Sequence, residues 1–348
     1  MKSLSQIYRE AHAIAHASTR LKADPTVNAA IDSKVSRESQ WTRKGSTTTY
    51  CERHLTAATP GPQPIAETMQ INYVKSRIKQ NINDEFQQKW ISQIKDLTVQ
   101  GRFLELLHLE QSHLSWRSLI YDLPRGILQF AINATIDTLA TNANLKRWGK
   151  KTNSNCKCGQ KETLHHILNN CPNMLERYGW RHDSILRTIY SHISTDPPIE
   201  TFVDLPNHML GVSTIPTDIL ITNLRPDLVI LNRSEKAITL FELSVPFETN
   251  ITATHLRKVQ RYEKLIFDLE NSGYNVSYYA FEIGSRGFIS KENLARLESV
   301  FHKFSKSKNH NEIRKCVMKI SLLCSFVIYH SKFDEHWIQP AYVKFDIP

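Results

Sequence analysis

The chain of 348 residues lacks long hydrophobic runs and an apolar leader, and it has little cysteine. Its longest apolar candidate, residues 316–329, is shorter than the ~20 residues needed to cross a bilayer and contains a lysine and two serines. The N-terminal segment is amphipathic and is interrupted by Lys2, Arg9 and Arg20, unlike a signal peptide. Six cysteines in so long a chain do not indicate a disulfide scaffold. These absences predict a soluble intracellular protein.

Acidic residues are fewer than basic ones, with 34 Asp and Glu against 44 Lys and Arg, so the formal net charge is +10. A basic surface favours a polyanionic partner. We therefore expect a polyanion such as DNA or RNA as the partner, and no membrane partner. The length predicts about two or three domains.

Composition and periodicity divide the chain into four expected parts. Residues 1–64 are polar and are predicted to be poorly ordered, with one helix near the start and a proline-rich linker at 60–64. Residues 65–152 show helical periodicity, residues 153–175 contain clustered cysteines, and residues 176–340 alternate strand and helix patterns. The predicted class is α+β or α/β, with an N-terminal helical bundle, a small knuckle, a mixed sheet flanked by helices and a helical C-terminus.

Two apolar, β-branched runs at residues 225–231 and 237–245 are separated by a polar break and predict a β-hairpin. If residues 233–236 form the loop, facing positions sum to 469, and Asp227 then faces Glu242. Like charges directly opposed across a sheet are destabilising, and a divalent cation held between the carboxylates would reverse that effect. The pair therefore predicts a magnesium site for phosphodiester chemistry. The alternative is two exposed acids at strand ends in a shifted register.

Cysteine and histidine cluster in the pattern Cys156-x-Cys158, seven residues, His166, four residues, Cys171. Zinc prefers tetrahedral coordination by such nitrogen and sulfur ligands. Gly159 permits a tight reversal after the second cysteine, and a short helix at residues 164–169 would present His166, with His165 as the alternative ligand. The pattern predicts a structural zinc knuckle. The alternative is a set of reduced cysteines with an unrelated histidine.

Residues 146–151 interleave cations with an aromatic side chain. Cations neutralise phosphates and an indole stacks on a base, so this basic segment predicts contact with a single strand or RNA. The alternative is a solvated helix end with a buried indole. The residues concerned are Lys146, Arg147, Trp148, Lys150 and Lys151.

The apolar spacing of residues 254–270 predicts an amphipathic helix. Lys258 and Tyr262 are four residues apart and share one of its faces. Lys258 could therefore reach a metal-bound water or a phosphate. Alternatively, it is one of several solvated cations beside Arg257, Arg261 and Lys264.

Four stretches, taken together, resemble the C-terminal part of a site-specific non-LTR retrotransposon polyprotein that carries a restriction-like endonuclease of the PD-(D/E)xK type. They lie in order along residues 125–337 of the chain. They are residues 130–149, the Cys–His stretch with Arg177-Tyr-x-Trp-Arg-His-Asp183, the acids with Lys258 and Tyr262, and Glu282-Ile-Gly-Ser-Arg-Gly-Phe288.

The resemblance implies a metal-dependent nuclease that nicks target DNA so that the freed 3′ hydroxyl primes reverse transcription, and it implies residence in the nucleus. Asp227 and Glu242 would bind magnesium, Lys258 would be the displaced motif lysine, and Tyr262 would lie close by. Residues 65–152 would correspond to the region after the polymerase thumb, and residues 176–340 to the endonuclease. Arg181 and His182 match recognisable positions, with DNA contact or a packing role as the two alternatives.

The chain departs from the family pattern at two points. Ser244 stands where the PD-(D/E)xK motif has its lysine, two residues after the acid. No Tyr-x-Asp-Asp sequence and no adjacent pair of aspartates occurs, so the polymerase palm is absent and reverse transcription is not expected. The rival prediction is a nucleic-acid-binding protein with a zinc knuckle and an inactive nuclease fold.

Overall fold

The chain is α+β, with helices around one four-stranded mixed sheet in the part that the structure describes. It divides into two compact units, Met1–Leu97 and Thr98–Pro348. The computed structural model describes residues 4–22, 25–41, 47–58, 67–97, 103, 116–194, 196–206, 208, 213–306 and 309–343.

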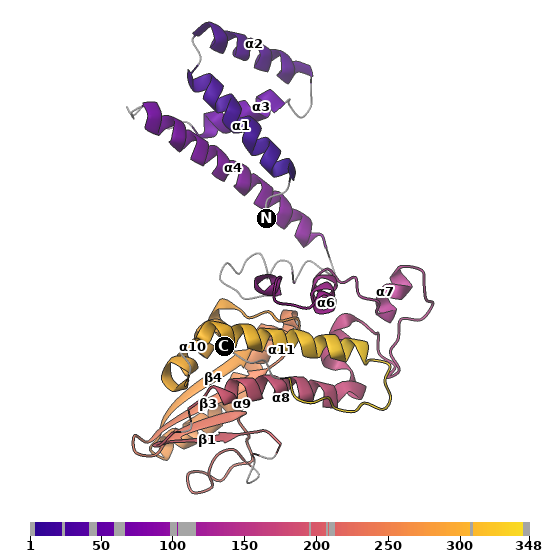
Figure 1. The fold of residues 1–348 in the computed structure, drawn as a ribbon, viewed down its shortest axis with the longest axis vertical. Helices are drawn as coiled ribbons and strands as arrows, with labels where there is room; N and C mark the ends of the chain where they lie inside the picture. Colours follow the sequence, from indigo (N-terminus) through magenta and orange to yellow (C-terminus); the bar gives the residue numbers. More distant parts are fainter. Residues whose placement is uncertain are drawn as a thin grey trace. The chain divides into compact units, whose positions relative to one another are not determined.

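In the part that the structure describes, the first unit consists of helices (Figure 1). Their shared core is built from small and aliphatic side chains. On α4, Val74, Ile78 and Ile82 recur every four residues and form one buried stripe. Small residues such as Ala13 and Ala17 on α1 let the neighbouring helices approach closely. The helices are α1 (Leu4–Lys22), α2 (Pro25–Trp41), α3 (Thr47–Ala58) and α4 (Glu67–Lys95).

The expected boundaries at residues 64 and 152 differ from those of the two units. Residues 1–64 contain three helices instead of a poorly ordered segment, because α1 and α3 pack against α4. Residues 65–152 do not form one bundle, since α4 belongs to the first unit and Ile127 and Ala131 pack into the core of the second. The linker at 60–64 and the leucine-rich segment after Phe103 lie outside the described residues.

The sheet of the second unit has the strand order β1-β2-β3-β4. The first two pairings are antiparallel and the last is parallel. The expected hairpin register is confirmed, because Asn232 pairs with Ala237 and Leu228 with Phe241. The parallel pair requires a crossover, which is α9. The elements are β1 (Ile199–Val203), β2 (Leu228–Asn232), β3 (Ala237–Ser244), α9 (Ile251–Asn271) and β4 (Asn275–Glu282).

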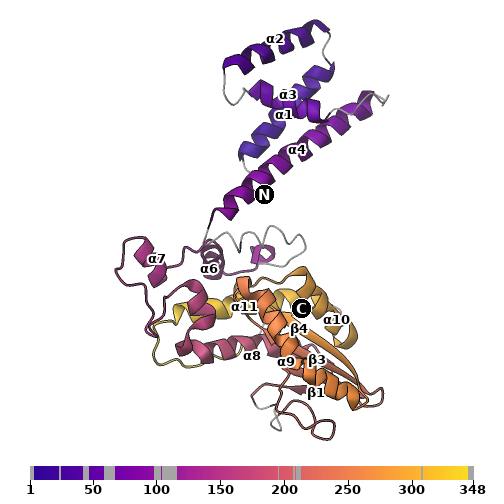
Figure 2. The same cartoon turned by 180° about the vertical axis from the view of Figure 1, so that it is seen from behind.

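Alternate residues of the central strands enter two different cores. Leu228 and Ile230 face one core, with residues of α8, α10 and α11, whereas Val229 and Leu231 face the other, with residues of α9. Both views show α8 and α11 side by side, and Figure 2 shows α9 across the strands. These helices are α8 (Leu175–Ser191), α10 (Lys291–Phe304) and α11 (His310–His330).

Shorter helices lead into and out of the cysteine-rich segment. Among them, η1, α6 and η2 contact α11, which attaches this segment to the sheet domain. No helix among the described residues is long and apolar enough to span a membrane. The shorter helices are η1 (Trp116–Leu119), α6 (Arg125–Thr135), α7 (Asn142–Arg147), η2 (His166–Asn170), η3 (Pro172–Met174) and η4 (Glu248–Asn250).

Candidate functional site

Asp227 and Glu242 lie together on the sheet face that α9 covers. The register places them opposite each other, one step beyond the Leu228–Phe241 pair. The side-chain alternation of β3 turns Glu242 to the same side as Leu240, which packs with α9. Both side chains are buried. The alternative of two exposed acids in a shifted register is therefore wrong.

Hydrogen bonds fix the two carboxylates to each other's strands. The backbone N–H of Asp227 donates to Glu242 Oε2 at 3.3 Å, and the backbone N–H of Leu243 donates to Asp227 Oδ2 at 2.6 Å. Burial, and secondly the charge of Asp227, raise the pKa of Glu242 to about 7. Two hard oxygen donors this close together could hold a cation between them.

Lys258 reaches this acid pair from α9. Its ammonium group forms an ion pair with Glu242 Oε1. Its side chain is only partly exposed, so it is not simply a solvated cation, as the alternative held. Ser244, in the usual lysine position, is buried beside it. Tyr262 is also buried, and its hydroxyl donates to the carbonyl oxygen of Arg225 at 3.0 Å, so Tyr262 positions the backbone that leads to Asp227.

His182 joins the acid pair from α8, a contact that the sequence did not predict. Its Nε2 lies 3.3 Å from Asp227 Oδ2, and its Nδ1 lies 3.1 Å from Asp183 Oδ1. Burial opposes protonation, but the charge of Asp227 and the hydrogen bonds to both carboxylates outweigh it and raise the pKa of His182 to about 10. In the sequence, the one signal for this contact was that His182 and Asp183 are adjacent on a helix whose neighbouring residues are buried.

Arg181 does not serve the expected contact with nucleic acid. Its side chain is 2% exposed, and it donates to Ser325 Oγ, the Leu168 carbonyl and the Val245 carbonyl. It therefore ties α11, the cysteine-rich segment and the loop after β3 together. The packing alternative fits this position better, because a guanidinium buried this deeply does not reach a phosphate at the surface.

A cavity of about 370 Å³ opens beside the acid pair. One wall is α9, and the opposite wall is the helix η2 of the cysteine-rich segment, with Asn169 and Asn170. No carboxylate is present among the described residues that line it. Its lining is thus suited to an anion, and we call it the basic pocket. The basic side chains in its lining are Arg181, His182, Arg257 and Lys258.

The four predicted ligands of the Cys–His cluster converge, with all donor atoms within 4.8 Å of one another. The sulfur atoms of Cys156 and Cys171 are 3.7 Å apart, and Cys158 Sγ lies 3.2 Å from His166 Nε2. A tetrahedral zinc ion with Zn–S bonds of about 2.3 Å requires a sulfur–sulfur separation of about 3.8 Å. The residues therefore fit a zinc ion.

The local backbone explains how the cluster forms. Cys156 N–H donates to the Gln160 carbonyl at 2.8 Å, which closes a turn with Gly159 at a positive φ of 88°. The next helical turn carries His166, and burial lowers the pKa of this imidazole. It is thereby kept neutral, the form that binds metal.

His165, the alternative ligand, points away from the cluster toward the loop after β3. Its ring contacts Phe247 at a centroid distance of 4.8 Å, and the amide nitrogens of Asn170 and Asn250 lie 3.2 Å from its Nε2. Asn169 Nδ2 donates to the Val245 carbonyl at 2.7 Å. Neighbours of the Cys–His ligands therefore contact the loop that follows β3, the strand that carries Glu242.

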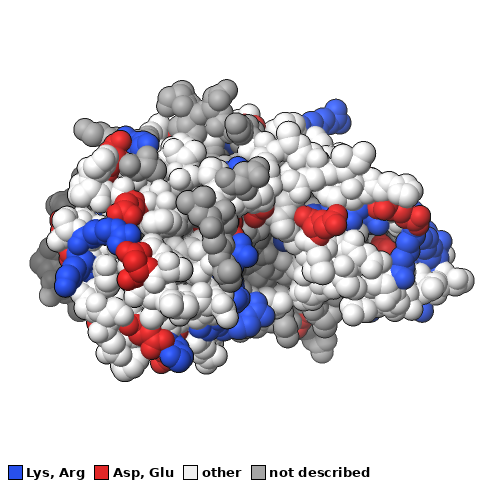
Figure 3. All heavy atoms as spheres, turned by 90° about the horizontal axis from the view of Figure 1, so that it is seen from below, with Lys and Arg blue, Asp and Glu red and all other residues white. Residues whose placement is uncertain are grey.

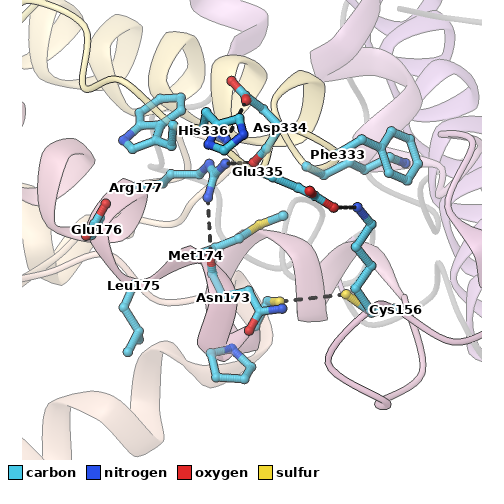
Figure 4. A pocket seen from close by; sticks show the side chains of 15 residues that line it. Cys156, Asn173, Met174, Leu175, Glu176, Arg177, Phe333, Asp334, Glu335 and His336 are labelled. Atoms are coloured by element: carbon cyan, nitrogen blue, oxygen red, sulfur yellow. Dashed lines mark hydrogen bonds and ion pairs between the residues drawn. The ribbon is translucent and has the colours of Figure 1, made fainter.

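A larger cavity of about 680 Å³ lies on another side of the Cys–His cluster. Figure 4 shows Cys156 on its wall and Arg177 turned toward Asn173 and Asp334. Arg177 donates to the carbonyls of both, at 3.1 and 2.7 Å, and to Ser331. These bonds engage all three of its nitrogens, so Arg177 holds the walls of this cavity together.

The basic segment at residues 146–151 is exposed along its whole length. Trp148 is 41% exposed, so the alternative with a buried indole is wrong. Arg147 lies 3.8 Å from Asp137, and Lys151 donates to Asn142 Oδ1 at 2.8 Å. On the described part of the face in Figure 3, basic and acidic side chains alternate, so that face carries no field of one sign.

Comparison with models of known families and with curated proteins found no match for this chain.

Proposed function

We propose that this chain is a metal-dependent DNA endonuclease of retrotransposon origin, with a restriction-endonuclease-like sheet. The observation that carries the proposal is the buried Asp227–Glu242 pair with Lys258 in contact. Two adjacent buried acids are unfavourable unless a cation or a proton accompanies them. Their position at the edge of a pocket with basic walls matches the needs of phosphodiester hydrolysis.

Asp227 and Glu242 would hold Mg²⁺, which when bound polarises a phosphoryl oxygen and lowers the pKa of water. Lys258 stabilises the negative charge that develops on the phosphate and orients the attacking water. The water oxygen bonds to phosphorus and loses a proton to solvent as the bond from phosphorus to the 3′ oxygen breaks. The 3′ oxygen takes up a proton from solvent and leaves as the 3′ hydroxyl. His182 holds the Asp227 carboxylate in place.

The phosphate-binding walls come from two parts of the fold. Arg257 faces the basic pocket, and Arg261 and Lys264 continue along the exposed side of α9 at spacings of four and three residues. These cations would follow the backbone of a DNA strand, and the basic segment would bind a further stretch of DNA or RNA. Nicking in the nucleus to prime reverse transcription by another polypeptide is the role that the family resemblance supplies.

The proposal is tested with supercoiled plasmid and Mg²⁺. We expect the wild type to convert plasmid to the open circular form, and Asp227→Asn and Glu242→Gln to lose this activity while retaining zinc and DNA binding. Asp218→Asn is the matched control, because Asp218 is an exposed acid on another part of the domain. Equal nicking by wild type and both acid variants would contradict the proposal.

The rival function is a nucleic-acid-binding protein that does not cut. The observation in its favour is that Lys258, His182 and backbone N–H groups already neutralise or satisfy the acids. DNA binding by the wild type without nicking, in Mg²⁺ or Mn²⁺, would establish this function instead.

A further inference from the structure

A second group of potential metal ligands lies where α10 approaches the start of α11. Glu298 and His302 are four residues apart on α10 and therefore share one face. His310 is the first residue of α11 and meets them from the other helix. Each offers one donor atom, and the three donors lie within 4.8 Å of one another. Neither the Cys–His cluster nor the acid pair uses these residues.

The separations match those of a coordination sphere. Glu298 Oε1 lies 3.4 Å from His302 Nε2 and 3.5 Å from His310 Nδ1. Ligand bonds of about 2.0–2.1 Å in a tetrahedral zinc site require donor separations of about 3.3–3.4 Å. A metal ion could thus bind with small movements of these side chains.

The surroundings hold two of the ligands in place and leave the third accessible. Arg314 forms an ion pair with the other carboxylate oxygen of Glu298, which leaves Oε1 directed at the histidines. The ring of His310 contacts Phe301 at a centroid distance of 5.6 Å, and its side chain is 13% exposed. The His302 side chain is 70% exposed, so an ion can enter from solvent.

We propose that Glu298, His302 and His310 bind one transition-metal ion of the zinc class. Three protein ligands would leave the fourth position to water. Imidazole nitrogens favour Zn²⁺, Co²⁺ or Ni²⁺ over Mg²⁺, so this site is chemically distinct from the acid pair. The ion fastens α10 to α11, two helices that form the core on one face of the sheet. The proposal does not depend on nuclease activity.

The test measures the zinc content and Zn²⁺ binding of the full chain near neutral pH, by elemental analysis and calorimetry. The wild type should bind two equivalents, one at the Cys–His cluster and one here. His302→Ala and His310→Ala should each lose one equivalent. Excess Mg²⁺ should not displace the ion. His12→Ala, at an exposed histidine of the other unit, is the matched control and should bind two.

Cobalt distinguishes the two sites, because only the Cys–His cluster can give thiolate-to-metal charge-transfer absorption. The equivalent lost in the histidine variants should lack this absorption. Glu298→Gln, which preserves side-chain size, repeats the test if His310→Ala lowers the melting temperature in chelator. A wild type whose only bound equivalent shows the thiolate absorption overturns the proposal. The proposal is also overturned if His302→Ala and Glu298→Gln still bind a second equivalent. Glu298, His302 and His310 would then form only ion pairs with one another.

Discussion

The Cys–His cluster and the acid pair are two candidate metal sites that are assembled in opposite ways. All four donors of the cluster come from residues 156–171, and a turn and one helical turn bring them together. The acid pair takes Asp227 and Glu242 from a hairpin, Lys258 from the helix after it and His182 from the helix before it. The first site is a local chelate, whereas the second exists only when the sheet domain is folded.

The two sites also differ in what their donors already contact. The donors of the Cys–His cluster face one another, and soft thiolates favour zinc. The carboxylates of the acid pair contact a lysine, a histidine and backbone N–H groups, and hard oxygens favour Mg²⁺. Yet His165 and Asn169 connect the two regions through the loop after β3. Loss of zinc from the Cys–His cluster should therefore lower nicking at the acid pair.

The largest effect is expected from Cys171→Ser. The substitution removes a buried zinc ligand, and structural zinc contributes on the order of 10 kcal/mol of binding free energy in small domains. We expect loss of zinc, a large fall in melting temperature and loss of plasmid nicking. Cys51→Ser, at a buried thiol of the other unit, should retain zinc and nicking. Full nicking by zinc-free protein would show that the acid pair does not depend on zinc at the Cys–His cluster.

Substitution of Lys258 tests the acid pair, the second of the two sites compared. Lys258→Met should lower the nicking rate by about 10²–10³-fold, because a charged group aimed at the developing negative charge is lost. DNA affinity and zinc content should change little. Ser244→Lys added to Lys258→Met should restore part of the rate, since position 244 adjoins the same pocket. Lys79→Met, at an exposed lysine of α4, is the control. An unchanged rate in Lys258→Met would remove Lys258 from the site.

The pH dependence of stability should reveal the acid pair in protein measured with chelator present. The pKa of Glu242 is raised from 4.5 to about 7, so the folded protein holds this proton more tightly than the unfolded chain. The stability from protonated Glu242 is present below about pH 4.5 and is lost as the pH rises to about 7. The loss is on the order of 3 kcal/mol.

Denaturant titrations at several pH values measure this effect. Glu242→Gln should remove the slope between pH 4.5 and 7, and Mg²⁺ should restore stability to the wild type at pH 7 by offsetting the charge. Glu200→Gln, at a partly exposed acid of β1, should keep the slope. Identical profiles for wild type and Glu242→Gln would show that this carboxyl does not titrate as described.

The smallest effect concerns the basic segment. Lys146→Ala with Lys150→Ala should weaken binding of single-stranded DNA or RNA and reduce the slope of log affinity against log salt by about 1.5. Lys79→Ala with Lys89→Ala removes the same charge from exposed positions of α4 and should leave the slope closer to wild type. The measurement is fluorescence anisotropy across a salt series. Equal slopes for the two double variants would exclude a specific role for the basic segment.

Sequence patterns predicted the hairpin register, the helix that carries Lys258 and the convergence of the four Cys–His ligands. Each depends on short-range geometry: the two-residue period of a strand, the 3.6-residue period of a helix and the reach of a tight turn. The same reasoning failed for residues 1–64. Their helices bury small residues such as Ala13 and Ala17, which give a weak hydrophobic signal.

By itself, the sequence determined which residues of the hairpin face each other and which side chains can hold zinc. Only the tertiary structure decided that Arg181 is buried, that His182 contacts Asp227 and that η2 forms a wall of the basic pocket. The physical reason is that burial and long-range contact depend on how distant elements pack against one another. Neighbours along the chain constrain backbone angles, but they do not specify which distant surface a side chain will meet.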